Sequence, residues 1–163
     1  MKYIALFCLI ITTTSCTVNY SLSGKSISPD VKTFSVAYIS NQAQQIVPTL
    51  SDDFTEELKE KFRSQAGLQL VQRNGDLEFS GKIVTYNVSY LGVTASQEAA
   101  QNRLTITVEI DYINNNDLSK NFTKKFTSTR DFDARGGNIE EAYIPEMIDE
   151  LVSEIFMDSV ASW

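Results

Sequence analysis

Leu104-Thr105-Ile106-Thr107-Val108-Glu109-Ile110-Asp111-Tyr112 is the segment with the clearest periodic pattern in the chain. Apolar and polar residues alternate along it without a break, which is the pattern of a β-strand with one buried face and one face in water. A helix does not fit this pattern, because its side chains repeat about every 3.6 residues. The stretch therefore predicts a sheet that packs one face against a core and leaves the other face wet.

Further strands are predicted on both sides of this stretch. The turn residues Asn114-Asn115-Asn116-Asp117 lead into a returning strand over residues 122–132. Upstream, residues 77–90 form a long predicted strand whose apolar positions change parity. A change of phase by one residue moves side chains to the opposite face, so we expect a β-bulge or a strong twist at residues 81–84.

An apolar stripe predicts the first of two helices. Phe54, Leu58 and Phe62 recur every four residues, which places them on one face of a helix. Ser51 or Thr49 can cap the start of this helix with its hydroxyl group. The opposite face is mostly charged, so we expect the helix to lie on a surface with its stripe turned inward.

The remaining elements are a second helix and two short strands. Apolar residues at helical spacing run from about Ile139 to the C-terminal region, with Pro145 in or near the first turn. Residues 33–39 and 68–71 are predicted as short strands. The order of elements predicts an α+β fold, a two-layer sandwich with two helices packed on one face of a mostly antiparallel four-stranded sheet.

The N-terminal region has the pattern of an export signal. Met1-Lys2 is a short positive segment, and residues 3–11 are an apolar run too short to span a bilayer, which takes about 20 residues. Cys16 follows a small residue at the end of this run, an arrangement that resembles a bacterial lipobox. Thr13 departs from that pattern, because a leucine is usual at its position.

We predict cleavage before Cys16 and acylation of Cys16, with an ordinary secretory signal and an incidental cysteine as the alternative. The predicted organisation is a lipoprotein signal peptide at residues 1–15, a lipidated tether at 16–31, and one α+β domain at 32–163.

Composition excludes several classes of function. The 163 residues carry a net charge of −7, which disfavours nucleic acid as a partner because phosphates are repelled. There is no histidine, and the only cysteines are Cys8 and Cys16, so the domain has no histidine base and no cysteine metal site. The composition thus removes the commonest general base and the commonest metal ligands. Over the whole sequence, we predict a protein that is not an enzyme, with no catalytic residues, no cofactor and no metal.

Charged residues on the predicted strands form two candidate functional sites, and the first consists of carboxylate pairs. Glu109 with Asp111, and Asp131 with Asp133, are carboxylate pairs that could serve hydrolysis of a glycosidic bond, although a solvated polar face is the simpler interpretation.

The second candidate functional site is a group of cationic side chains. Arg103, Lys124 and Lys125, with Lys120 and Arg130 nearby, fall on two strands joined by the Asn-rich turn. They could hold an anionic ligand such as the phosphates of a glycolipid, or they could be surface charges balanced by neighbouring carboxylates.

Several stretches together resemble a known family. They are Gly24-Lys25-Ser26-Ile27, Val31-Lys32-Thr33-Phe34-Ser35-Val36, Val47-Pro48-Thr49-Leu50-Ser51, Gly75-Asp76-Leu77-Glu78-Phe79-Ser80-Gly81, Asn102-Arg103-Leu104-Thr105-Ile106-Thr107-Val108, and Ile155-Phe156 close to Trp163. In their order and spacing they resemble the lipopolysaccharide-assembly lipoproteins of the LptE family, in the form found in Bacteroidetes-type bacteria. The resemblance covers nearly the whole predicted mature chain, and it implies a two-helix, four-strand sandwich.

The resemblance also implies a function. Members of the family are outer-membrane lipoproteins, anchored on the periplasmic side, that plug the LptD β-barrel and help it deliver lipopolysaccharide. We select Arg103, Lys124 and Lys125 as candidate lipopolysaccharide contacts from their charge and placement. A lipoprotein that binds another envelope or secretion complex is the first alternative, and a carboxylate-based hydrolase is the second.

Overall fold

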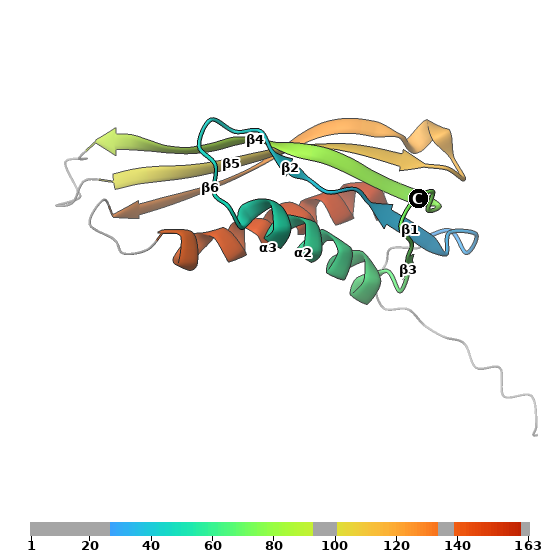
Figure 1. Cartoon of the computed structure of the whole chain (residues 1–163). Helices are drawn as coiled ribbons and strands as arrows, with labels where there is room; N and C mark the ends of the chain where they lie inside the picture. Colours follow the sequence, from blue (N-terminus) through green and yellow to red (C-terminus); the bar gives the residue numbers. More distant parts are fainter. Residues whose placement is uncertain (1–26, 93–100, 134–138, 161–163) are drawn as a thin grey trace, which may run out of the picture.

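The computed structural model describes residues 27–92, 101–133 and 139–160, in which two helices cover one face of a β-sheet (Figure 1). The strands are β1 (Thr33–Val36), β2 (Ser40–Asn41), β3 (Gln69–Leu70), β4 (Leu77–Gly92), β5 (Gln101–Asn114) and β6 (Phe122–Asp133). The helices are α2 (Leu50–Gln65), α3 (Ile139–Val160) and the short 3₁₀-helix η1 (Leu118–Lys120). The predicted α+β class with two helices on one sheet face is confirmed.

The sheet differs from the predicted one in strand number and direction. Its order is β3-β1-β4-β5-β6, with β2 also paired to β4. Strands β4, β5 and β6 are antiparallel neighbours, whereas β1 and β2 run parallel to β4 and β1 runs parallel to β3. The prediction of a mostly antiparallel four-stranded sheet is therefore wrong in detail, because the sheet is mixed and has six strands. The parallel pairs arise because α2 lies between β1 and β3 and carries the chain back to the same end of the sheet.

The long strands follow the sequence pattern closely. Along β5, Leu104 and every second residue up to Tyr112 are buried. The predicted irregularity in β4 is confirmed as a register shift between Ile83 and Thr85. Close by, a Cβ atom at Gly81 would lie 2.1 Å from the backbone oxygen of Glu109, so only glycine allows β4 to approach β5 this closely.

The core lies between the sheet and the two helices. The predicted stripe of Phe54, Leu58 and Phe62 is fully buried. The ring centroid of Phe62 lies 4.4 Å from that of Phe79 and 5.1 Å from that of Phe156, so one aromatic side chain joins α2 to the sheet and to α3.

Two local predictions about the helices are wrong. Ser51 lies inside α2, and Thr49 occupies the N-cap position without a capping hydrogen bond from its side chain. The backbone of Thr49 is in the α-helical region rather than the extended region from which a cap residue usually reaches the first amides. Pro145 lies inside α3 rather than in its first turn, on an exposed side of the helix.

Several predicted features lie outside the described residues. They are the leader, Cys16, the tether as far as residue 26, the loop at 93–100, and Trp163. Neither α2 nor α3 is long and apolar enough to cross a lipid bilayer, among the helices that the structure describes.

Removal of the Phe62 ring should strongly destabilise the domain. Phe62→Ala leaves a cavity among three aromatic neighbours, and such truncations cost about 3–5 kcal/mol of the free energy of unfolding. The measurement is urea denaturation followed by circular dichroism. Ile46→Ala is the control, because Ile46 is 69% exposed and its truncation should cost less than about 0.5 kcal/mol. Equal midpoints for the two variants would contradict the assigned core.

Candidate binding surfaces

The sheet face that turns away from the helices is polar over most of its length. The row Glu78-Ile113 at one end includes an exposed apolar side chain, Ile113, and the five rows that follow it are polar. Residues directly opposite one another on antiparallel strands point to the same side, so the pairing defines the rows. From one end, the rows are Ser80-Asp111-Thr123, Lys82-Glu109-Lys125, Thr85-Thr107-Thr127, Asn87-Thr105-Thr129 and Ser89-Arg103-Asp131. We call these residues the polar face. The two middle rows consist only of threonine and asparagine, and charged residues lie toward both ends.

Hydrogen bonds link the hydroxyl groups of the polar face across strands. The hydroxyl oxygens of Thr107 and Thr127 lie 3.0 Å apart, and the Thr123 hydroxyl donates to the Asp111 carboxylate at 2.6 Å. These side chains are short and partly satisfied by one another. The face is therefore hydrophilic and able to hydrogen-bond a wet partner, without a strong charge at its centre.

The charged ends of the polar face are internally neutralised. Glu109 lies 3.0 Å from the Lys82 ammonium and 3.6 Å from that of Lys125, and these contacts, chiefly the Lys82 hydrogen bond, lower the pKa of Glu109. At the other end, the Arg103 guanidinium donates to both oxygens of Asp131 at 2.6 and 2.8 Å. This bidentate pair lowers the pKa of Asp131 and raises that of Arg103.

The predicted carboxylate pairs do not form an acid–base site in this arrangement. Glu109 and Asp111 share the polar face, as their spacing predicts, but each has a structural partner. A general acid for glycoside hydrolysis needs a raised pKa, whereas the pKa values of Glu109 and Asp131 are lowered. Within the described residues there is also no cluster of metal-ligating side chains.

The three predicted lipopolysaccharide contacts lie on two faces of the sheet. Lys124 turns to the helix side, where it forms an ion pair with Asp158 of α3 and lies 5.0 Å from the centroid of the Phe126 ring. Lys125 and Arg103 are on the polar face, but their rows are six residues apart along β5, which is roughly 20 Å. Each cation already has a carboxylate partner, so their role in binding lipopolysaccharide stays a prediction.

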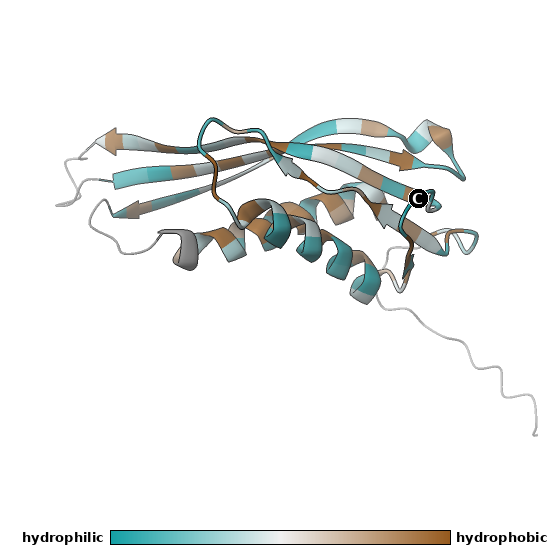
Figure 2. Cartoon of the chain, in the orientation of Figure 1, coloured by the Kyte–Doolittle hydropathy of each residue, from teal (hydrophilic) through white to brown (hydrophobic). Residues whose placement is uncertain are grey.

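The outer surface of the helix layer is acidic. Helix α2 carries more carboxylates than cations, and α3 between residues 142 and 160 carries carboxylates only. Figure 2 shows polar residues along the outer side of α2. A groove of about 720 Å³ lies over both helices, and apolar residues, two cations (Lys59 and Arg63) and five carboxylates line it. The carboxylates are Asp53, Glu56, Glu57, Glu60 and Asp149. This surface repels phosphate groups.

A second distinct region is the end of the molecule where the described chain begins. We call residues 30–33, 73–78 and 113–121 the tether end. One oxygen of the Asp76 carboxylate accepts hydrogen bonds from the backbone N–H groups of Lys32 and Thr33 and from the Thr33 hydroxyl, each at 2.9 Å. The two backbone hydrogen bonds are the main cause that lowers the pKa of Asp76.

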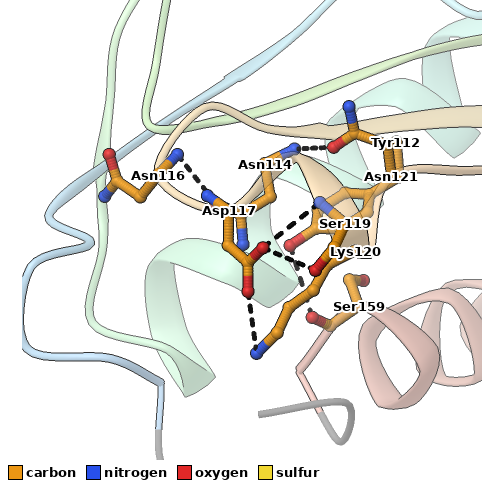
Figure 3. A network of polar contacts seen from close by, with 8 residues as sticks. All are labelled: Tyr112, Asn114, Asn116, Asp117, Ser119, Lys120, Asn121 and Ser159. Atoms are coloured by element: carbon orange, nitrogen blue, oxygen red, sulfur yellow. Dashed lines mark hydrogen bonds and ion pairs between the residues drawn. The ribbon is translucent and has the colours of Figure 1, made fainter.

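The Asn-rich hairpin closes the tether end and joins it to α3 (Figure 3). The side-chain oxygen of Asn114 accepts from the backbone N–H groups of Asn116 and Asp117 at 3.0 Å. The Asp117 carboxylate in turn accepts from the hydroxyl of Ser119 at 2.6 Å. The Tyr112 hydroxyl donates to the backbone oxygen of Ser159 in α3 at 3.4 Å, and burial raises the pKa of Tyr112 to about 12.

The sequence predicts this hairpin only as a turn. The run of asparagines was the available signal, because asparagine side chains bond their own backbone in turns. The contact of Asn115 and Asn116 with segments some forty and eighty residues upstream depends on the sheet order, which the sequence does not reveal.

Comparisons with known proteins agree with this architecture. A family model described as "LptE: Lipopolysaccharide-assembly" matches residues 31–159. Among solved structures, the chain is similar to rare lipoprotein B from Shewanella oneidensis, with a TM-score of 0.58 and 17% identity, over 80% of this chain and 95% of that one.

Two further solved structures share the fold. An uncharacterised lipoprotein B from Nitrosomonas europaea has a TM-score of 0.53 and 14% identity, over 89% of this chain and 92% of that one. A hypothetical protein from Chlamydia trachomatis has a TM-score of 0.52 and 12% identity, over 77% and 94% of the two chains. At these identities the structures show a common fold alone. No curated protein matches the sequence.

Titration can show which of the two lysines beside Glu109 lowers the pKa of that carboxyl more. Lys82→Gln should raise the pKa of Glu109 toward its usual value, and Lys125→Gln should raise it less, because the Lys82 contact is the shorter and dominant one. The measurement is a carbon-13 NMR titration of the Glu109 carboxyl in the two variants and the parent protein. A larger rise in Lys125→Gln would show that this row is arranged differently.

The Asp76 carboxylate should make stability depend on pH. Its pKa is lowered in the folded protein, so its contribution is present above the unfolded pKa near 3.8 and is lost as pH falls through the lower folded value. Asp76→Asn should lower the free energy of unfolding at pH 7 by about 1–3 kcal/mol. In urea denaturation the difference from the parent should shrink below about pH 4.

The control for this prediction is Asp52→Asn, which changes an exposed carboxylate in the first turn of α2. Its effect at pH 7 should be smaller than that of Asp76→Asn. A gap between Asp76→Asn and the parent that stays constant down to acidic pH would contradict the assigned hydrogen bonds.

Proposed function

The chain belongs to the LptE family of lipopolysaccharide-assembly proteins, and from this premise we propose that it is a non-enzymatic lipoprotein of the outer membrane. In this proposal, acyl chains such as palmitate on Cys16 hold the protein on the periplasmic side. The folded domain lies in the lumen of an LptD-type β-barrel and supports its assembly and its transport of lipopolysaccharide.

The polar face is the observation that carries the proposal. The lumen of a large membrane barrel is polar and contains water, so a plug needs a surface that is stable against water and polar side chains. The middle rows around Thr107 offer hydroxyl and amide groups at short spacing, with no apolar side chain in them. A partner with an apolar docking surface would leave these groups without hydrogen bonds, which is unfavourable.

The dimensions of the sheet also suit a barrel lumen. Strand β4 has 16 residues, and a strand of that length extends roughly 50 Å. The apolar band of an outer-membrane barrel is about 25 Å tall. The sheet is therefore long enough to pass through the depth of the barrel wall and still project beyond it on one side.

The charge distribution limits where lipopolysaccharide could bind in this proposal. The acidic outer surface of the helices opposes phosphate groups. Arg103, Lys124 and Lys125 stay the candidate contacts, and each would have to exchange its carboxylate for a phosphate oxygen. Arg103 suits this exchange best, because its bidentate geometry toward Asp131 is also the geometry that guanidinium adopts with phosphate.

Purification of the native lipidated protein from mild-detergent extracts of outer membranes tests the proposal. Mass spectrometry should identify an LptD-like barrel at close to equal amounts. Recovery of the protein alone, or with an unrelated envelope or secretion complex, would overturn the plug assignment and favour a lipoprotein with another partner.

A substitution on the polar face should weaken the complex without unfolding the domain. Thr107→Arg places a long charged side chain in the uncharged middle of the polar face, and we expect recovery of the barrel to fall at least fivefold. Ser64→Arg on exposed α2 is the matched control and should leave recovery unchanged. Thermal denaturation of both variants checks folding. Equal recovery for the two variants would show that the polar face does not contact the barrel.

A further inference from the structure

The far half of β4 has a neighbouring strand on one side only. Strand β1 pairs with β4 as far as Phe79, and β2 pairs with it as far as Ile83. After Asn41 the chain leaves the sheet and runs to α2, while β4 continues to Gly92 (Figure 1). In the part of the chain that the structure describes, residues 84–92 therefore pair with β5 alone. We call the side of these residues that turns away from β5 the open edge.

The backbone of β4 presents hydrogen-bonding groups at the open edge. The backbone oxygen of Ile83 accepts from the N–H group of Gln42 at 2.9 Å, so the backbone groups of Ile83 turn away from β5. Ile83 stands opposite an even-numbered residue of β5, and so do Val88 and Tyr90, because the extra residue at the register shift belongs to β4. The N–H and C=O groups of Val88 and Tyr90 therefore point out of the sheet, where an added strand would meet them.

The open edge lacks the charges that protect the opposite edge of the sheet. Strand β6 also has one neighbouring strand, and within 12 residues it carries Lys124, Lys125, Arg130, Asp131 and Asp133. Charged side chains, lysine above all, keep an edge strand from pairing with another chain. Residues 83–92 of β4 contain no charged side chain. Of the two long edges of the described sheet, that of β4 is the one suited to a further strand.

The side chains and the space beside β4 also suit an extended peptide. Val88 is 36% exposed and Tyr90 is 68% exposed, although both point to the side of the sheet on which the helices lie. A hollow of about 520 Å³ lies between residues 84–87 of β4 and the segment of Gln44 and Gln45. An added strand would run beside this hollow, cover Val88 and Tyr90 with its apolar residues, and extend the polar face with the residues between them.

We propose that the open edge of β4 binds an extended segment of a partner protein as an additional strand. The backbone of the segment hydrogen-bonds to Val88 and Tyr90, and main-chain bonds of this kind are the basis of strand addition. Its side chains are uncharged opposite Thr85 to Tyr90, and apolar residues alternate with polar ones. In the complex proposed above, the barrel protein supplies this segment, so the inference rests on the proposed function for the identity of the partner alone.

A second copy of the chain suits the open edge less well. Antiparallel pairing of two open edges about Val88 would place Leu77 of each copy, and with it each tether end, roughly 35 Å from the symmetry axis on opposite sides. The predicted anchors at Cys16 would then start from opposite ends of the pair, although both have to enter one membrane. A segment from a different protein has no such restriction.

Backbone hydrogen exchange of the full-length lipidated protein tests the proposal. The protein is measured in isolated outer membranes and again after purification alone in mild detergent, with fragment masses that resolve the amides of Val88 and Tyr90. Both amides should exchange at least about tenfold more slowly in the membranes, because each gains a hydrogen bond. The amide of Gln72, in the exposed segment after β3, is the control and should exchange alike in both samples.

Two outcomes separate this inference from the proposed function. Equal exchange of both amides in the two samples would overturn the added strand, and it would leave the barrel assignment standing if the barrel is still recovered with the protein. Slow exchange of both amides in a protein that is recovered with a different complex would support the added strand and overturn the barrel assignment.

A photo-crosslinking residue identifies the occupant of the open edge. The variant Tyr90→p-benzoylphenylalanine is irradiated in the same membranes, and the crosslinked peptides are sequenced by mass spectrometry. A crosslink to an uncharged segment of another protein, together with slow exchange at Val88, would support the proposal. Crosslinks to residues 84–92 of a second copy, or to residues 16–26 of this chain, would overturn it.

Proline at position 88 tests the backbone contact by itself. Val88→Pro removes an N–H group that points away from β5, so the ladder between β4 and β5 keeps its hydrogen bonds. Recovery of the partner should fall about fivefold, the effect of one lost hydrogen bond. Val88→Thr keeps the N–H group and a β-branched side chain, and it should reduce recovery much less. Equal recovery for the two variants, both folded by thermal denaturation, would overturn the backbone pairing.

Discussion

The alternation of side chains along β5 sets the two faces of the sheet and, through them, the position of the helix layer. Successive residues of a strand must point to opposite sides, so Leu104 and its apolar partners can be buried only if the residues between them face away from the helices. The helix layer covers one side, and the polar face forms on the other as a geometric consequence. The core around Phe62 and the hydrophilic surface around Thr107 are thus two results of one pattern.

The charges of the sheet serve the packing of the helix layer. Arg130 and Lys124, on the helix side of β6, pair with Glu150 and Asp158 of α3. Exposed ion pairs of this kind contribute about 0–1 kcal/mol each, so they orient α3 on the sheet more than they stabilise it. These ion pairs also allow the acidic helix α3 to lie beside the sheet, because the cations that balance its carboxylates come from β6 and not from α3 itself.

The polar face and the tether end are two distinct surfaces of the domain. The polar face is a long hydrophilic surface, the one that we propose for contact with a barrel lumen, and the tether end is closed by the hairpin network. The hairpin network through Tyr112 and Ser159 joins the tether end to α3, so the orientation of one end is transmitted to the whole two-layer body.

Features that depend on local periodicity could be predicted from the sequence alone. The alternation in β5, the change of phase before Thr85 and the stripe of Phe54, Leu58 and Phe62 all follow from residues close together in the chain. Family membership was also visible in the order and spacing of short stretches. The segment of β3 was predicted as a short strand, but β2 has only two residues and shows no period, and the parallel pairing of β1, β2 and β3 joins distant segments, so a six-stranded mixed sheet could not be predicted.

Which charged side chains form ion pairs depends on the tertiary fold and could not be predicted from the sequence. Lys124 and Lys125 are adjacent in the chain, yet the pleat of β6 sends one to Asp158 on a helix and the other to Glu109 on the polar face. The same long-range pairing places the Asp76 carboxylate beside the backbone N–H groups of Lys32 and Thr33. Partners of this kind lie dozens of residues away in the sequence, and their distances are set by strand order and by the side to which each residue points.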